Sequence, residues 1–281
     1  MSRINIGGQA VMEGVMMRNN DRYAVAVRKP DKQIEVKTNR CTGTSDRPAV
    51  CNLPIVRGVF SFVQSLTIGV KTLMYSAQFF EDEEEEAPKK EKKKKKEKTK
   101  EQESRAEKAE MAFSIVLAVG LFMLLPAWIA SLLDAVIKSH VLIGLIEGVI
   151  RLAIFLGYVI AISRMEDIKR TYMYHGAEHK TINCLEHGNE LTVENVMQAS
   201  RFHKRCGTSF LFIVMIVSIL VFMCITVDAM WLRLLLRVLL VPVIAGISYE
   251  FIRFAGNSES WIANLLSKPG LLIQRLTTKE P

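Results

Sequence analysis

The chain has 281 residues and a formal net charge of +8, and its composition is 49% apolar and 23% charged. This mixture indicates apolar segments joined by charged connectors. Lysine and arginine collect on the cytoplasmic side of multispan membrane proteins, so the basic excess does not require a nucleic acid, and we expect no nucleic-acid partner. The five cysteines are scattered and odd in number, which argues against a disulfide framework, and the N-terminus lacks the apolar core of a signal peptide.

Residues 1–52 are expected to form a small cytoplasmic unit that contains β-structure. The unit begins with GGQAVMEGVMMR, which we interpret as a loop. This loop either packs against the helices or acts as a lid that contributes Glu13 or Arg18 to a substrate site. Further along, Tyr23–Arg28 and Gln33–Lys37 show partial alternation on either side of a Lys-Pro-Asp-Lys turn, which predicts a β-hairpin.

Two different segments connect this unit to the first apolar span. Residues 53–80 form a mostly apolar stretch that predicts a helix at the membrane interface or otherwise associated with the membrane, and entry into the bilayer at an angle stays an alternative. Residues 81–110 alternate acidic and lysine runs, cannot bury a core, and predict a disordered linker that becomes helical near the first span. A lysine patch touching anionic lipid is the alternative for this linker.

The remaining sequence predicts a mainly α-helical, multispan membrane protein. Four apolar stretches form two helical hairpins, 111–163 and 208–252. The individual spans are expected at residues 111–133, 142–163, 208–227 and 231–252, with a kink at Pro126. A segment rich in His, Glu and Cys, 164–207, separates the hairpins, and the tail 253–281 follows them. Because basic residues gather in 164–206, the positive-inside rule predicts that this segment and both termini are cytoplasmic.

The segment between the hairpins contains the motif His175-Gly-Ala-Glu178-His179. Histidines four residues apart lie on one side of a helix and can bind one divalent metal, while a carboxylate beside them can act as general base on metal-bound water. The order H-x-x-E-H is the reverse of the zincin order. The alternative is an amphipathic helix whose histidines only form hydrogen bonds.

The nature of the metal site depends on its further ligands. A catalytic zinc takes three protein ligands and leaves a fourth position for water, and His203, Glu194 or Glu250 could supply the third ligand. A closed structural site would instead recruit both His203 and Cys206. Neutral imidazole suits several transition metals, and zinc is the ion that we expect.

Charged residues inside the spans form a second candidate site. Glu147 and Arg151 lie one turn apart in the second span, and Arg237 lies at a similar depth in the fourth. Isolated charges at such depth cost roughly 2.5–3.5 kcal/mol on insertion scales, so these residues are expected to pair. The group either orients the helices as a structural ion pair or forms a polar pocket for an anionic or lipid-like headgroup.

Several longer stretches resemble the bacterial YqhQ family. They are GGQAVMEGVMMR, EGVIRLAIF, YHGAEHKTINCLE, LTVENV and HKRCGTSF. The resemblance covers nearly the whole chain except the 81–110 linker. It implies a multispan protein of the bacterial inner membrane, described as a predicted metal-dependent enzyme, and it implies a site that uses His175, Glu178, His179, His203 and Cys206. It supplies no substrate.

We therefore expect a metal-dependent, hydrolase-like enzyme at the cytosolic face of the membrane, which acts on a membrane-embedded peptide or a lipid-linked molecule. Two alternatives remain. One is a transporter or ion-handling protein, with the charges of the spans along its path; with only four spans it would need to oligomerise. The other is a non-catalytic membrane scaffold with a structural metal clip.

Overall fold

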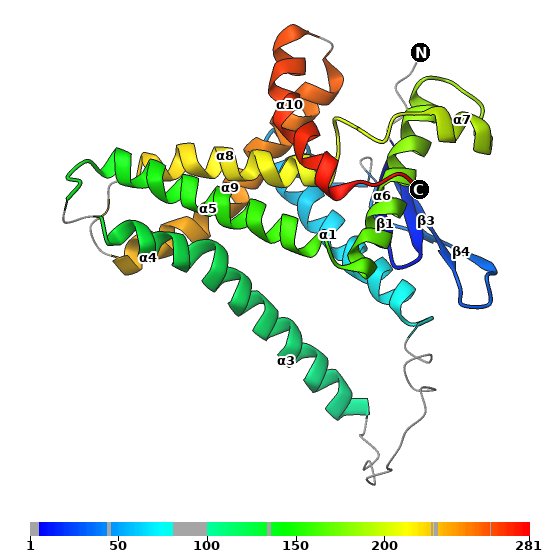
Figure 1. Ribbon diagram of the computed structural model, residues 1–281, viewed down its shortest axis with the longest axis horizontal. Coiled ribbons are helices and arrows are strands. Elements are labelled where there is room, and N and C mark those ends of the chain that lie inside the picture. The colour runs from blue at the N-terminus through cyan, green and yellow to red at the C-terminus, as the bar shows by residue number, and fades with distance from the viewer. Residues whose placement is uncertain are drawn as a thin grey trace.

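The computed structural model describes residues 6–43, 46–80, 100–133, 136–225, 227, 230–258 and 260–281. A four-stranded sheet lies at one end of an elongated bundle of apolar helices (Figure 1). The strands are β1 (Ile6–Val11), β2 (Gly14–Asn19), β3 (Arg22–Arg28) and β4 (Ile34–Arg40). The short helical turns are η1 (Ala49–Asn52) and η2 (Gly120–Leu124), and the α-helices are α1 (Val56–Ala77), α3 (Lys100–Val119), α4 (Leu125–Ser131), α5 (His140–Ile162), α6 (Glu166–Glu186), α7 (Val193–Gln198), α8 (Gly207–Met223), α9 (Met230–Asn257) and α10 (Trp261–Thr277).

The sheet is an antiparallel meander in the order β1-β2-β3-β4. The hairpin of β3 and β4 confirms the predicted one, including its turn. The predicted N-terminal loop is wrong, because that stretch forms β1 and β2, joined by a two-residue turn in which Glu13 has a φ of 49°. The glycines of this stretch interrupt the alternation of apolar and polar residues by which strands are recognised in a sequence.

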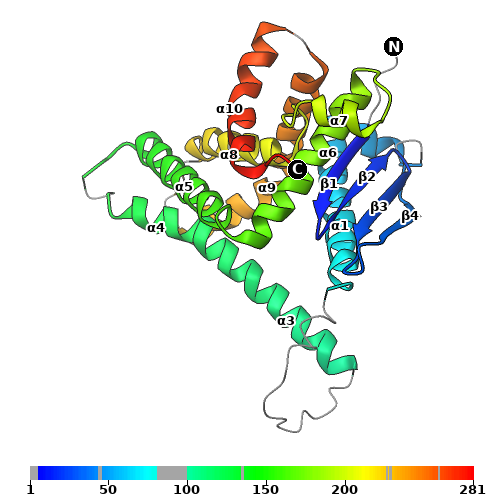
Figure 2. The same ribbon diagram turned by 45° about the vertical axis from the view of Figure 1, so that its right-hand side comes forward.

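Helices cover both faces of the sheet. Val11, Val25 and Val27 form an apolar cluster with Met16, and Ile68 of α1 packs against it from one side. On the other side α6 lies along β1 and β2 (Figure 2). Burial of each such valine contributes roughly 1.5–3 kcal/mol, so the sheet is held against α1 mainly by apolar packing. The β1 strand is thereby fixed between two helices.

The helix predicted within 53–80 is present as α1, which packs on α9 and on β1. Several of its apolar residues are exposed, among them Val63, Leu66 and Leu73. In the described residues α1 is not one of the helices that are long and apolar enough to cross a membrane. Its position at the membrane interface stays a prediction.

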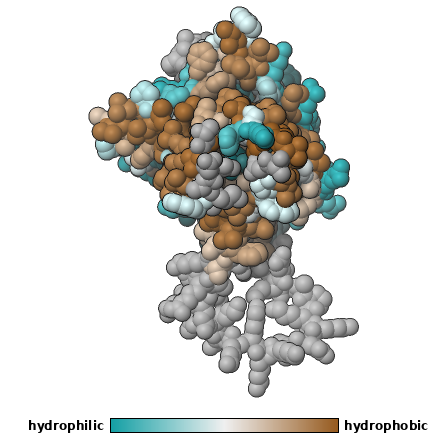
Figure 3. All heavy atoms as spheres, turned by 90° about the vertical axis from the view of Figure 1, so that its left-hand side faces the viewer, coloured by the Kyte–Doolittle hydropathy of each residue, from teal (hydrophilic) through white to brown (hydrophobic). Residues whose placement is uncertain are grey.

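Within the described parts of the chain, three helical stretches are long and apolar enough to cross a membrane: Met111–Ser131, His140–Ile162 and Leu235–Asn257. Only 6% of the most apolar part of the first stretch is buried, and apolar residues cover much of the end of the bundle in Figure 3, which is the surface expected of helices that lie in a membrane. The predicted third span is shorter than expected. Its helix, α8, ends at Met223 and has 17 residues, a length of roughly 25 Å against a hydrocarbon core of roughly 30 Å.

The first span is interrupted where the kink was predicted. The π-helical turn η2 lies between α3 and α4, directly before Pro126. Proline has no N–H to donate to the carbonyl four residues earlier, which is that of Phe122. Nε of Arg151 donates to this carbonyl instead, at 3.0 Å. Of the predicted linker 81–110, residues 81–99 lie outside the described residues, and residues 100–110 are the helical start of α3, as predicted.

The C-terminal helix brings the chain back to α6. α10 packs on α8 and α9, and the chain after α10 runs along α6, where the N–H of Lys279 donates to the carbonyl of Tyr172 at 2.9 Å. Gly176 of α6 makes this approach feasible, because a Cβ there would collide with the carbonyl oxygen of Lys279. The middle of α6 is consequently enclosed by β1 on one side and by the C-terminal segment on another (Figure 2).

Candidate metal centre

The middle of α6 buries polar rather than apolar side chains. Glu178, His179, Lys180 and Asn183 all have less than a tenth of their surface exposed. Buried polar groups of this kind need partners, and they mark a functional region more often than a packing core. The acidic first turn of α6, at Glu166, favours the helix through its macrodipole but lies away from this region.

The ligand atoms of His175, His179 and Cys206 converge next to α6. They lie within 4.8 Å of one another and form a group that could hold a metal ion. Nε2 of His175 is 3.2 Å from Sγ of Cys206, and the centroids of the two imidazole rings are 4.4 Å apart. The two histidines lie on one side of α6, as their spacing predicts, whereas Cys206 is the residue that directly precedes α8.

Backbone carbonyls fix the orientation of both imidazoles. Nδ1 of His175 is 2.8 Å from the carbonyl oxygen of Thr277, and Nδ1 of His179 is 2.7 Å from that of Arg201. A carbonyl oxygen only accepts hydrogen bonds, so each Nδ1 carries a proton and donates it. In a neutral ring the Nε2 atom then has a free lone pair. This is the arrangement in which proteins hold metal-binding histidines.

Glu178 lies beside the same group. Its Oε2 is 3.8 Å from Nε2 of His175 and 3.8 Å from Nε2 of His179. Gly8 of β1 covers it, since a Cβ on Gly8 would come within 2.5 Å of Oε1 of Glu178. Burial raises the pKa of Glu178 to about 7, although the neighbouring His175 acts in the opposite direction. A carboxyl group with such a pKa can take up and release a proton near neutral pH.

His203 lies near the group, and one of its ring nitrogens contacts an acid instead. Its ring centroid is 5.8 Å from that of His179, but its Nε2 is 3.1 Å from Oε2 of Glu186. Arg205 also donates to this carboxylate. Among the described residues His203 does not belong to the three-ligand group, and its Nε2 is engaged by Glu186, an acid that the sequence analysis did not pair with it.

The two glutamates considered as third ligands lie elsewhere. Glu250 of α9 forms an ion pair with Arg57 of α1 and accepts the N–H of Ile55 at 3.3 Å. The prediction that placed Glu250 beside the metal was based only on its depth in the membrane. In the structure its carboxylate is paired with the guanidinium group of Arg57 instead. Glu194 is exposed in the first turn of α7. In the described part of the chain, neither belongs to a three-ligand group.

The N-terminal hairpin reaches the site through its backbone rather than through the predicted side chains. Glu13 accepts hydrogen bonds from Arg170 and from the hydroxyl of Tyr174, both on α6. Arg18 donates to Oε1 of Gln64 on α1 at 2.7 Å. The strand β1 nevertheless covers Glu178 at Gly8, a position that the sequence analysis missed. The paired glycines of this stretch were the available signal, whereas nothing in the sequence points to the carbonyls of Thr277 and Arg201.

The charged residues of the spans do meet, at a distance from the metal ligands. Oε1 of Glu147 accepts from Arg151 at 2.6 Å, and its Oε2 accepts from Arg237 at 2.6 Å. Both guanidinium groups also lie 5.3 Å from the ring of Phe222. All three ionised groups are at least 90% buried, so the cluster connects α5, α8 and α9 inside the bundle and carries a surplus positive charge.

Comparison with known proteins identifies the family but no activity. The family described as "Protein of unknown function (DUF1385)" matches residues 53–281, which include all three ligands of the candidate metal centre. The uncharacterized protein YqhQ of Bacillus subtilis (strain 168) is 35% identical over 289 residues, which cover 98% of this chain and 86% of that protein. No solved structure matches. The chain therefore belongs to the DUF1385 family and is homologous to YqhQ, as the resemblance of its motifs predicted.

Proposed function

We propose that this protein is a metal-dependent, hydrolase-like membrane enzyme, in which His175, His179 and Cys206 hold the metal and Glu178 acts as general base. The observation that supports this proposal best is the pair of hydrogen bonds from the two Nδ1 atoms to backbone carbonyls. They leave two nitrogen lone pairs facing a thiol, and hydrogen bonding alone would not require this alignment.

The donor set fits a transition metal. Two imidazole nitrogens and one thiolate are ligands that zinc prefers, and three protein ligands leave a fourth position for water or substrate. Related ions such as iron and copper accept the same donors, and the proposal names zinc first. When bound, such a metal supplies Lewis-acid activation of water or of a carbonyl or phosphoryl group.

The residues of the chain then divide the remaining work. The carboxylate of Glu178 would accept a proton from the attacking water and return it to the leaving group, and its burial beside the two imidazoles supports this role. β1 shields this carboxylate from bulk water at Gly8. The carbonyls of Thr277 and Arg201 keep both imidazoles in the tautomer that binds metal.

The position of the site supports a substrate that is associated with the membrane. Cys206 directly precedes the apolar helix α8, so the ligand group lies at the end of the bundle. The excess of basic residues in 164–206 supports the cytosolic face. A membrane-embedded peptide and a lipid-linked molecule both fit this position.

Elemental analysis of the purified protein tests the proposal. We expect about one zinc per chain in the wild type and in Glu178→Gln, and loss of zinc in His175→Ala/His179→Ala. His187→Ala is a matched control, because His187 is an exposed histidine just beyond α6 and should keep the metal. A wild type that is metal-free after purification and after incubation with zinc contradicts the proposal.

Glu178→Gln separates a catalytic from a structural metal. In a catalytic site this variant keeps the metal and loses turnover, and substrate should accumulate in membranes that contain it. In a structural site, as in the scaffold alternative, membranes with Glu178→Gln should match the wild type in comparative lipid and peptide analysis. A group of three protein ligands among the described residues, to which His203 does not belong, favours the catalytic assignment.

The buried charges of the bundle support a second candidate function, in ion handling. A surplus guanidinium charge among Glu147, Arg151 and Arg237 is uncommon in a purely structural cluster, because charge inside a membrane is costly. Reconstitution into liposomes tests this candidate. Anion flux that is present in the wild type and absent in Arg237→Met would support it, and equal flux in protein-free liposomes would exclude it.

A further inference from the structure

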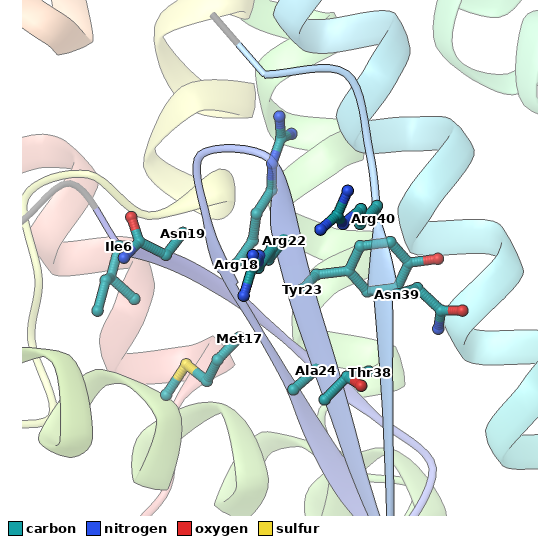
Figure 4. Close-up of a pocket in the computed structure, with 10 residues that line it drawn as sticks. All are labelled: Ile6, Met17, Arg18, Asn19, Arg22, Tyr23, Ala24, Thr38, Asn39 and Arg40. Atoms are coloured by element: carbon teal, nitrogen blue, oxygen red, sulfur yellow. The ribbon is translucent and has the colours of Figure 1, made fainter.

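The sheet carries an open hollow on the same face as α6, beyond the part of β1 and β2 that this helix covers. Its volume is about 700 Å³, and it lies at the strand ends formed by Asn19, Arg22 and Arg40. Figure 4 shows Arg18, Arg22 and Arg40 gathered at this end, with Ala24 and other uncharged residues further along the strands. The hollow has no part in the proposed metal chemistry.

Two of the arginines face each other directly. Arg22 of β3 is paired with Arg40 of β4 in the register of the sheet, so their side chains leave the same face about 5 Å apart. Like charges in directly opposite positions destabilise a sheet. The carboxylate of Asp21 is 3.9 Å from Nε of Arg22, and no ion pair or hydrogen bond to the Arg40 side chain is found among the described residues.

The neighbouring corner of the sheet has the same excess of positive charge. Arg18 lines the hollow, and Arg18 and Arg47 both donate to a single neutral atom, Oε1 of Gln64, each at 2.7 Å. Nε of Arg47 is buried and has no hydrogen-bond partner in the described structure. Arg18 and Arg47 thus add two guanidinium groups at the same end of the sheet, on the face that carries α1, whereas Arg22 and Arg40 extend from the opposite face.

Protection of a sheet edge does not explain this arrangement. Charged residues on an exposed edge strand prevent pairing with other chains, and this accounts for Lys37 and Arg40 on β4. Arg22, however, lies on β3, an inner strand that is paired on both sides. A ligand with at least two negative charges would convert the repulsion between Arg22 and Arg40 into attraction.

We propose that this hollow binds a phosphate-bearing ligand. The planar guanidinium group matches the oxygens of a phosphate in a bidentate manner, and several arginines around one hollow suit a diphosphate or a phosphate monoester. Asn19, Thr38 and Asn39 also line it and offer neutral hydrogen-bond donors. The phosphate comes either from a soluble molecule such as a nucleotide or from the headgroup of an anionic lipid.

The register places this site close to Glu178 but independent of it. Gly8, which covers Glu178, is paired with Met17, and Met17 is paired with Ala24 of the hollow. Two strand spacings, roughly 10 Å, therefore separate Gly8 from the middle of the hollow. Phosphate binding here does not rest on the metal or on hydrolase activity, and its test uses neither.

Calorimetric titration of the full chain with pyrophosphate, in detergent, tests the proposal. Arg22→Gln/Arg40→Gln should bind at least tenfold more weakly than the wild type. Arg28→Gln/Lys37→Gln removes the same charge from the same two strands outside the hollow, and it should change the affinity less than twofold. Equal weakening in the two double variants, or no binding to the wild type, would overturn the proposal.

Two further measurements complete the test. Thermal unfolding should show the Arg22→Gln/Arg40→Gln variant to be as stable as the wild type or more so, because a like-charge pair is removed; if this variant does not fold, Arg40→Gln alone serves in the titration. Titration in nanodiscs identifies the source of the phosphate. If the natural ligand is a lipid headgroup, phosphatidate in the disc should compete, and pyrophosphate should bind more weakly in phosphatidate discs than in phosphatidylcholine discs. Equal affinity in the two kinds of disc assigns a soluble ligand.

Discussion

At the scale of single residues, Cys206 has two roles in the structure. Its Sγ is 3.2 Å from Nε2 of His175, within the candidate ligand group. Its Sγ also accepts the N–H of Thr208 at 3.4 Å and thereby caps the N-terminus of α8. Sulfur is a weak acceptor, so the cap contributes little, whereas a thiolate is a strong ligand for zinc. A cysteine at this position therefore suits the proposed metal binding better than it suits capping.

Cys206→Ser distinguishes these two roles. Serine is a preferred N-cap residue, so the variant should fold with an unchanged melting temperature or a slightly higher one. Its affinity for zinc, measured by competition with a chelating dye, should fall at least tenfold because a hydroxyl is a poor ligand for zinc. Cys184→Ser, at a buried cysteine outside the ligand group, is the control for affinity. Unchanged affinity in Cys206→Ser would remove this residue from the site.

At the scale of elements, the site depends on how closely α6 is enclosed. β1 approaches it at Gly8, and the segment after α10 approaches it at Gly176. Gln274 of α10 also holds the loop before α8, because it accepts the N–H of His203 at 2.9 Å and donates to its carbonyl at 2.7 Å. Elements distant in sequence thus fix the positions of both imidazoles and of the thiol.

Gly8→Ala tests the contact between β1 and α6. The new methyl group would meet the buried carboxyl of Glu178, and overpacking of this kind costs roughly 1–3 kcal/mol of stability. Gly7→Ala is the matched control, because no atom lies within 4 Å of a Cβ at Gly7. Thermal unfolding of the metal-free protein measures both. The cost of Gly8→Ala should also shrink in a Glu178→Ala background, and an equal cost in both backgrounds would show that the two residues do not interact.

At the scale of the whole molecule, a buried cluster of charges joins the helices of the bundle. One carboxylate, that of Glu147, binds two guanidinium groups from different helices, and Nε of Arg237 is buried without a hydrogen-bond partner in the described structure. The three groups are therefore not equivalent. Loss of the single anion leaves two buried cations, whereas loss of Arg237 leaves a neutral pair.

The two substitutions should consequently differ in cost. Glu147→Gln should lower stability by roughly 3–5 kcal/mol, the usual cost of leaving buried charge uncompensated. Arg237→Met should cost distinctly less, because Glu147 and Arg151 remain paired and an unsatisfied N–H is removed. Thermal unfolding in detergent, followed by size-exclusion chromatography, measures the difference. If Arg237→Met is the more damaging variant, this account of the cluster is wrong.

Much of the architecture could be predicted from local sequence patterns. The i, i+4 spacing of His175 and His179 set their common helix face, and the apolar runs located the membrane helices, although α8 ends earlier than predicted. The depth of Glu147 and its basic neighbours predicted their pairing. These features depend on residues close in sequence or on hydropathy, which the chain displays directly.

The rest depended on tertiary contacts. Glu250 pairs with Arg57 and His203 with Glu186, and no pattern in the sequence distinguishes these partners from a metal. The hairpin of β1 and β2 was hidden by glycines, one of which, Gly8, is needed for the approach to Glu178. Candidate metal ligands could be predicted from the sequence, but the carbonyls that orient the two imidazoles belong to the backbone and have no residue signature.

The interruption before Pro126 makes two distant positions interdependent. An imino acid there frees the oxygen of Phe122, and the guanidinium of Arg151 occupies that oxygen. An alanine at position 126 would restore an amide able to donate to this acceptor, and Arg151 would then lose one of its two hydrogen bonds inside the bundle. The break in the first span thus provides a hydrogen-bond acceptor for an arginine of the neighbouring helix, so that positions 126 and 151 depend on each other.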